Sequence, residues 1–173
     1  MKILIKSRAE IETLSQTRFP AHTALISITD ACLDFADLMY KPEFLLQVAF
    51  DDVDNDIFID ELGRKPNEEE RRKLEEKYKM LTDSQTFQIA SFYYDHKNEI
   101  STLICQCEHG QSRSAAVAAA ILEFRSKRGI SVFSHDSYYP NKVVFRKVLS
   151  ALKDCIPVLD PKPENLPKES CTQ

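Results

Sequence analysis

Four short apolar runs, separated by longer polar segments, predict the β-strands of this chain. They are "KILIK" (2–6), "TALISIT" (23–29), "FLLQVAF" (44–50) and "ISTLICQC" (100–107). The second run is apolar almost without interruption, which is typical of a strand buried on both faces. In the third run Leu46, Val48 and Phe50 alternate onto one face, as side chains do along a strand. These patterns predict a sheet with a buried central strand.

Helical periodicity occupies much of the chain between and after these strands. The expected helices are a short one around Ile11 and Leu14, a charged one in 67–81, and three more at 83–97, 112–128 and 141–155. Ser7 and Glu10 form a capping-box pattern before the first helix, and Asp83 and Asn141 are expected N-caps. Gly129 is the expected stop of the apolar helix 112–128. Strands that alternate with helices favour an α/β fold with a central, mainly parallel sheet of four to five strands flanked by helices.

Length and composition favour one domain. With 173 residues, 43% of them hydrophobic, the chain can bury roughly 70% of its unfolded surface. We expect this domain over residues 1–157, with a charged helical insertion at about 55–80 that is a solvated surface helix, a lid or a partner-binding element. Four of the eight prolines lie from Pro157 onward, and residues 158–173 are therefore expected to form a flexible tail.

Charge and cysteine content narrow the class of protein. The net charge is −4 and no basic patch stands out in the sequence, so neither a general nucleic-acid partner nor a membrane partner is expected. The N-terminus becomes charged too early for a signal peptide, and no apolar run approaches the ~20 residues that span a bilayer. The five scattered cysteines are an odd number and are expected to be reduced thiols. A cytoplasmic protein is the resulting prediction.

The segment "CEHGQSRS" (107–114) stands between a buried strand and a buried helix. The free N–H groups of such a loop and of the first helical turn can converge on one point and bind an anion. Gly110 allows the backbone to approach a ligand closely, and Arg113 offers a planar pair of donors that suits phosphate oxygens. A thiol at the head of this loop lies in the same field, which favours the nucleophilic thiolate.

These residues resemble the signature of the cysteine-dependent protein tyrosine and dual-specificity phosphatases, in which five residues separate a cysteine from an arginine that precedes serine or threonine. The resemblance is specific over about 100–124. It implies a metal-independent phosphatase that needs no cofactor, with Cys107 as nucleophile, Arg113 as phosphate clamp and Ser114 as the hydroxyl that stabilises the leaving thiolate. The intervening loop residues would bind substrate: Glu108, His109, Gly110, Gln111 and Ser112. Gln106 departs from the family, which usually has histidine at this position. Its amide can form a hydrogen bond but carries no charge, so the degree to which the Cys107 thiolate is activated is left open.

The same resemblance implies a general acid on a loop after an upstream strand. The only stretch that fits is "LLQVAFDDVDND". The alternation that places Val48 and Phe50 on one face continues to Asp52, which is the first choice. Asp54 continues the same alternation and is the second choice, with Asp51 third.

Other interpretations of these residues remain open. Cys105, Cys107 and His109 could be soft metal ligands, but no fourth ligand is evident nearby and such ligands do not usually precede a buried helix. A phosphate-binding module that keeps the loop and has lost catalytic power is the main alternative to an enzyme. For an enzyme, the expected substrate is a phosphorylated protein or a small phosphate monoester, with phosphotyrosine first and phosphoserine or phosphothreonine next. The physiological substrate and the oligomeric state are not determined by the sequence.

Overall fold

The computed structural model describes residues 1–54 and 62–155. Its elements, in chain order, are β1 (Lys2–Ser7), α1 (Arg8–Leu14), β2 (Thr23–Thr29), β3 (Phe44–Ala49), α3 (Glu68–Lys77), α4 (Asp83–His96), β4 (Thr102–Cys107), α5 (Arg113–Ser126), α6 (Ile130–Phe133) and α7 (Lys142–Asp154). The expected C-terminal tail at 158–173 lies outside the described residues, as does the first part of the expected insertion, 55–61. No helix in the described ranges is both long and apolar enough to cross a membrane.

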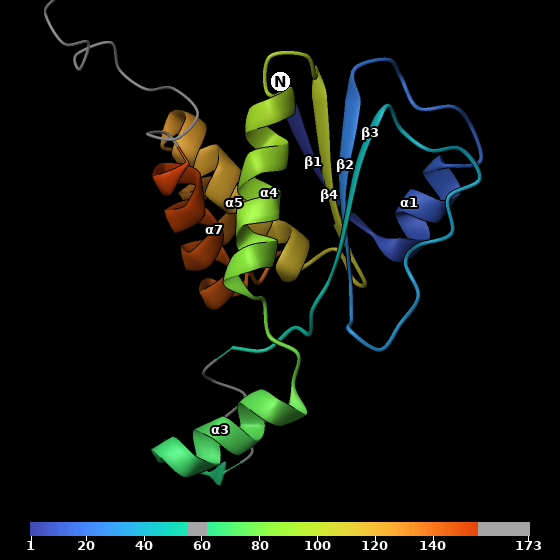
Figure 1. The fold of residues 1–173 in the computed structure, drawn as a ribbon. Coiled ribbons are helices and arrows are strands. Elements are labelled where there is room, and N and C mark those ends of the chain that lie inside the picture. Colours follow the sequence, from blue (N-terminus) through green and yellow to red (C-terminus); the bar gives the residue numbers. More distant parts are fainter. Residues whose placement is uncertain (55–61, 156–173) are drawn as a thin grey trace, which may run out of the picture.

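The four strands form one parallel sheet in the order β1-β4-β2-β3 (Figure 1). This arrangement confirms the predicted α/β fold with a mainly parallel sheet. Every residue of β2 is buried, because β2 has a strand on each side and side chains packed on both faces. All four strands end at the same edge of the sheet, where open parallel sheets place their functional residues.

Helices cover the two faces of the sheet unequally (Figure 1). The larger core lies between the sheet and the layer of α4, α5 and α7, and it includes Val48 and Phe50 of the predicted apolar face of β3. The smaller core packs Ile11 of α1 against Leu25 and Ile104 on the opposite face. Helix α5 is buried over most of its first two and a half turns, which explains why its sequence is apolar around its whole circumference.

Two predicted helix boundaries are wrong by a few residues, each for a local reason. Thr82, not Asp83, is the N-cap of α4, because its hydroxyl accepts a hydrogen bond from the backbone N–H of Gln85. Helix α5 ends at Ser126 with Lys127 in the left-handed conformation (φ 57°), and Gly129 has helical dihedrals that begin α6. A Cβ at Gly129 would lie 2.7 Å from the carbonyl oxygen of Ala119. Glycine is therefore required there for close packing, not to end α5.

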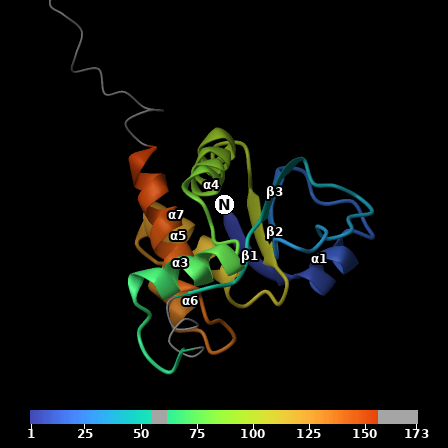
Figure 2. The same cartoon turned by 60° about the horizontal axis from the view of Figure 1, so that its bottom comes forward.

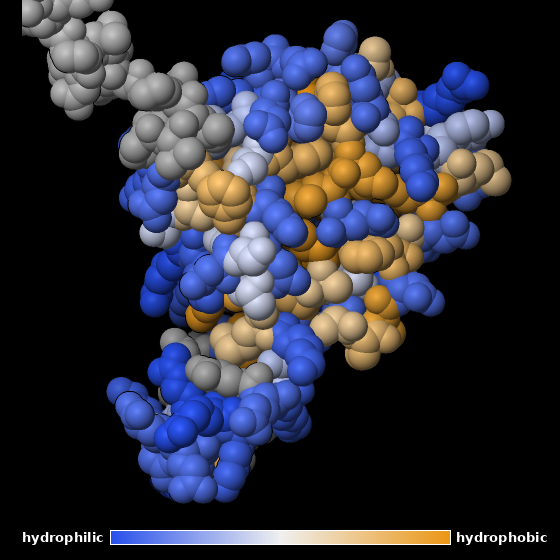
Figure 3. Space-filling view, viewed as in Figure 1, coloured by the Kyte–Doolittle hydropathy of each residue, from blue (hydrophilic) through white to orange (hydrophobic). Residues whose placement is uncertain are grey.

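The charged segment forms a shorter helix than the predicted 67–81. Helix α3 ends at Lys77, because Tyr78 adopts an extended conformation (φ −105°, ψ 135°). Its apolar side packs Leu74 against Val53 and Met80 in a small separate cluster. Figures 1 and 2 place α3 beyond the carboxyl ends of the strands, and Figure 3 shows that its surface is almost entirely hydrophilic. Helix α3 thus lies near the edge of the sheet at which all four strands end.

Candidate active site

The segment that begins with Cys107 has the expected strand–loop–helix form. Cys107 is the last residue of β4 and Arg113 is the first residue of α5. Gly110, between them, has a left-handed backbone (φ 70°), and a Cβ there would lie 2.6 Å from the backbone nitrogen of Ser7. Only glycine therefore allows this loop to rest against the end of β1.

Cys107 and Ser114 face one another across the loop. The Cys107 Sγ and Ser114 Oγ atoms are 3.1 Å apart, and either of them can be the donor. Cys107 is 2% exposed and Ser114 is fully buried. The Ser114 hydroxyl is thus within hydrogen-bonding distance of the Cys107 thiol.

Arg113 is buried at 3% exposure and is held on one side. Its Nη1 donates to the carbonyl oxygen of Phe50 at 2.7 Å and forms an ion pair with Asp30 Oδ1 at 2.6 Å. Its Nε is buried without a hydrogen-bond partner among the described residues, and the nearest carboxylate oxygen paired with it, Asp52 Oδ2, is 3.9 Å away. The guanidinium is therefore fixed in place and retains one N–H without a hydrogen-bond partner among the described residues.

Asp52 connects the loop after β3 to this site. Its Oδ1 accepts hydrogen bonds from the hydroxyl of Ser112 at 2.8 Å and from the side-chain amide of Asn141 at 2.9 Å. Asn141 also caps α7, as predicted, by accepting from the N–H groups of Val143 and Val144. Two donors from different elements thus fix a partly exposed carboxylate beside Arg113.

The two other candidate acids have different surroundings. Both carboxylate oxygens of Asp51 accept backbone N–H groups, one from Ala31 at 3.0 Å and one from Lys79 at 2.8 Å. Asp51 thereby joins the β2–β3 edge to the segment before α4. Asp54 is half-buried and is the last described residue before the gap at 55–61.

The remaining loop residues divide into two groups. Glu108 pairs with Arg8 Nε at 2.8 Å, and Arg8 also bonds to Thr29, so that the head of the loop is tied to α1 and β2. The side chains of His109 and Gln111 are exposed at the rim. Of the residues expected to bind substrate, Glu108 and Ser112 therefore make contacts within the protein, whereas His109 and Gln111 face outward.

Gln106 and Cys105 lie below the loop. The side chain of Gln106 points to the α1 face, away from Cys107, where it accepts from the Ser27 hydroxyl at 2.7 Å. Cys105 shares the face of Cys107; burial, with a further contribution from Cys107, strongly raises the pKa of the Cys105 thiol. Cys105 is therefore expected to remain a protonated thiol. In the described part of the chain, no three His, Cys, Asp or Glu residues are grouped to hold a metal ion.

Sequence reasoning did not identify Asp30 and Arg8, and found Asn141 only as a helix cap. Asp30 directly follows β2, and the ends of adjacent parallel strands meet at one edge. This placement was the available signal that Asp30 could reach a residue at the end of β4. Arg8 offered no comparable signal, because a surface arginine in a first helical turn is ordinary.

Comparison by sequence identifies no family for this chain. No protein-family model matches it, and no curated protein matches it. One solved structure, described as a mouse "putative dual specificity phosphatase" complexed with zinc tungstate, aligns over 91% of this chain and 86% of its own length. The identity is 15% and the TM-score 0.44, and this weak likeness supports no assignment of individual residues.

Proposed function

We propose that this chain hydrolyses phosphate monoesters at Cys107, without a metal ion, through a phosphocysteine intermediate. The observation that carries the proposal is the burial of the Arg113 guanidinium and the set of contacts that it makes. The guanidinium is buried and held by Asp30 and the Phe50 carbonyl, while its Nε has no hydrogen-bond partner within the described ranges and only a 3.9 Å ion pair with Asp52. A buried donor without a partner is costly. Beside a glycine-containing loop at a helix N-terminus, an anion is the acceptor that fits.

The chemistry follows from the neighbours of this anion site. The Cys107 thiolate attacks phosphorus and the bond to the leaving oxygen breaks, while Asp52 gives that oxygen its proton. Water then attacks phosphorus, Asp52 takes its proton, and the sulfur–phosphorus bond breaks to release inorganic phosphate. Ser114, 3.1 Å from Cys107 Sγ, donates to the departing thiolate. Arg113 and the loop N–H groups hold the phosphoryl oxygens throughout.

The proposed substrate is phosphotyrosine in a protein, with phosphoserine and phosphothreonine as further substrates to test. The loop 108–112 contains no lysine, whereas loops selective for inositol phosphates in the resembling superfamily tend to carry lysines. The outward-facing His109 and Gln111 are the loop side chains proposed to meet the body of the substrate.

The first experiment is hydrolysis of para-nitrophenyl phosphate with EDTA present, for the wild type beside Cys107→Ser. We expect the wild type to turn over and the variant to be inactive, because serine replaces the thiolate with a far weaker nucleophile. The variant should still bind vanadate or phosphate, since Arg113 and the loop amides remain. Full activity in Cys107→Ser would refute the mechanism.

The second candidate is a phosphate-binding module without significant turnover. The observation that favours it is Gln106, a neutral amide bonded to Ser27 at the position where the resembling family has histidine. Phosphate or vanadate binding by the wild type, with no hydrolysis of any ester, would select this alternative.

A further inference from the structure

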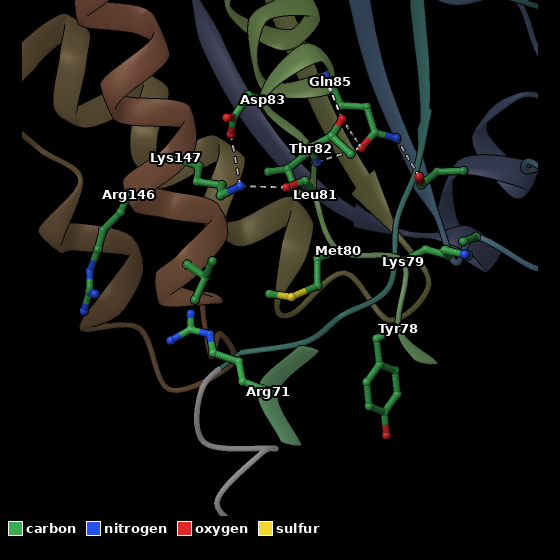
Figure 4. A pocket seen from close by; sticks show the side chains of 13 residues that line it. Arg71, Tyr78, Lys79, Met80, Leu81, Thr82, Asp83, Gln85, Arg146 and Lys147 are labelled. Atoms are coloured by element: carbon green, nitrogen blue, oxygen red, sulfur yellow. Dashed lines mark hydrogen bonds and ion pairs between the residues drawn. The ribbon is translucent and has the colours of Figure 1, made fainter. Parts of the chain in front are cut away.

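A cavity of about 970 Å³ lies beside the candidate active site, and four cationic side chains line it (Figure 4). Arg71 comes from α3, Lys79 from the segment between α3 and α4, and Arg146 and Lys147 from α7. One carboxylate, Asp83, also lines it and pairs with Lys147 at 3.1 Å. We call this space the basic cavity. Among the described residues that line it, cationic side chains outnumber carboxylates, whereas the net charge of the whole chain is −4.

The wall of the basic cavity is continuous with the segments that hold the catalytic candidates. Ala31 and Ala49 line the cavity; Ala31 follows Asp30, and Ala49 precedes Phe50, the two residues that hold Arg113. Consecutive Cα atoms lie about 3.8 Å apart. A molecule in the cavity would therefore lie only a few ångströms from the backbone that positions Arg113.

A second connection runs through the loop that carries Asp52. The backbone N–H and carbonyl of Lys79 bond to the side chain and backbone of Asp51, each at 2.8 Å. On the α7 side, Val143 lines the cavity two residues after Asn141, which holds Asp52. The residues that line the basic cavity thus contact or adjoin the segment that carries Asp52 of the proposed reaction centre.

The lining of the basic cavity suits a peptide. Met80, Leu81 and Val143 give it apolar surface, and its size reaches that of ordinary ligand sites, ~300–1,000 Å³. Lys79 and Arg146 are exposed, so their charges are available to a molecule that enters from solvent. A cavity with apolar surface between cationic side chains can hold an extended peptide segment. The acidic side chains of that segment would reach the cations at the rim of the cavity.

We propose that the basic cavity binds acidic residues that flank the phosphorylated residue of a protein substrate. This inference rests on the proposed function, because the flanking residues enter the cavity while the phosphate occupies the loop after Cys107. An anionic membrane is disfavoured as the occupant, since an extended negative surface would also meet the acidic remainder of the chain, whereas a short peptide meets the local cations.

The test compares two phosphotyrosine peptides of equal length, one with Asp and Glu flanks and one with Asn and Gln flanks. The measured quantity is the ratio of their kcat/KM values. For the wild type at low salt we expect a ratio of roughly five to ten in favour of the acidic peptide, falling as salt screens the charges. Arg146→Glu should reduce the ratio to about one or below. Lys153→Glu, an equal charge change at an exposed position of the same helix, should keep the wild-type ratio.

The possible outcomes separate this inference from the proposed function. A wild-type ratio of one, with both peptides hydrolysed, would refute the cavity assignment and leave the phosphatase standing. Hydrolysis of neither peptide would refute the phosphatase. The cavity would then be tested with the acidic peptide lacking phosphate, by fluorescence polarisation, and equal binding by the wild type and Arg146→Glu would overturn it. Binding to phosphatidylserine vesicles that Arg146→Glu abolishes, without peptide binding, would assign the cavity to a membrane and overturn the peptide proposal.

Discussion

At the scale of single residues, the arrangement around Arg113 is the basis of the proposed anion site. A buried cation is costly unless opposite charge or hydrogen bonds compensate it. Asp30 supplies a carboxylate at 2.6 Å from Nη1, and the Phe50 carbonyl supplies a second acceptor. Both contacts are made by Nη1, and Asp52 remains 3.9 Å from Nε. The guanidinium is thus oriented by the protein before any anion binds.

The proposed role of Asp52 gives a prediction about leaving groups. Asp52→Asn removes the proton donor, and kcat should fall by ~10²–10⁴ for a poor leaving group such as tyrosine. The loss should be smaller for para-nitrophenol, whose oxygen needs less protonation. Steady-state kinetics on both substrates measure the difference, with Asp54→Asn as the matched comparison. If Asp54→Asn shows the large loss and Asp52→Asn does not, the acid is Asp54.

At the scale of elements, some residues are explained by their neighbours in the sequence and others by contacts with distant segments. Gly110 is required both by its left-handed backbone (φ 70°) and by the end of β1, a distant segment that leaves no room for a Cβ. Helix α1 is explained locally: Ser7 accepts from the N–H of Glu10, and the Glu10 carboxylate accepts from the N–H of Ser7. The hydrogen bond from Lys6, and then that from the Ser7 backbone, lower the pKa of Glu10.

This lowered pKa predicts a pH-dependent contribution to stability. A carboxylate whose folded pKa lies below its unfolded value of ~4.3 stabilises the fold above that value, and the contribution is lost as pH falls through the folded pKa. Glu10→Gln keeps a capping side chain and removes the charge. At pH 7 it should cost a few tenths of a kcal/mol, because the pair with Lys6 is half-exposed.

Urea unfolding at pH 7 and at pH 3 measures this contribution. The difference between the wild type and Glu10→Gln should be larger at pH 7 than at pH 3, because it is lost as the pH falls through the lowered pKa of Glu10. Glu76→Gln, an exposed change on α3, should match the wild type at both values. A difference of equal size at both pH values would assign the effect to shape or packing instead of charge.

At the scale of the whole molecule, helix α7 connects the main hydrophobic core with the candidate active site. Helix α7 packs on both α4 and α5, with Val148 and Leu152 fully buried. Its N-cap, Asn141, holds Asp52, and its exposed side carries Arg146 at the basic cavity. The packing of this amphipathic helix therefore sets the position of both proposed sites.

A cavity in this interface should destabilise the entire fold. Leu152→Ala removes a fully buried side chain from the main core, and we expect a loss of ~2–5 kcal/mol in the free energy of unfolding. Lys153→Ala, at the exposed neighbouring position, should change it by less than about 0.5 kcal/mol. Urea titration followed by circular dichroism measures both values. A loss below 1 kcal/mol for Leu152→Ala would mean that α7 is not part of the cooperative core.

Most elements of this fold were predictable because their signals are local. The strand runs, the capping box at Ser7 and the N-cap at Asn141 are patterns of neighbouring residues, and the structure confirms them. The prediction for Asp83 was wrong because the neighbouring Thr82 caps the helix instead. The prediction for Gly129 was wrong because this glycine is required for close packing and does not form a left-handed turn. For the site, the sequence was sufficient to place Cys107, Arg113 and Ser114 in one strand–loop–helix segment.

The sequence by itself determined the parallel α/β pattern and the glycine-containing loop that we propose binds an anion, because hydrophobic period, glycine and loop length act over a few neighbouring residues. Only the tertiary structure decided that Asp30 holds Arg113, that Asn141 holds Asp52 and that Arg8 holds Glu108. It also decided that α3 and α7 place cations around one cavity. The partners in these contacts are far apart in the chain, and they meet because parallel strands bring their carboxyl ends to one edge of the sheet.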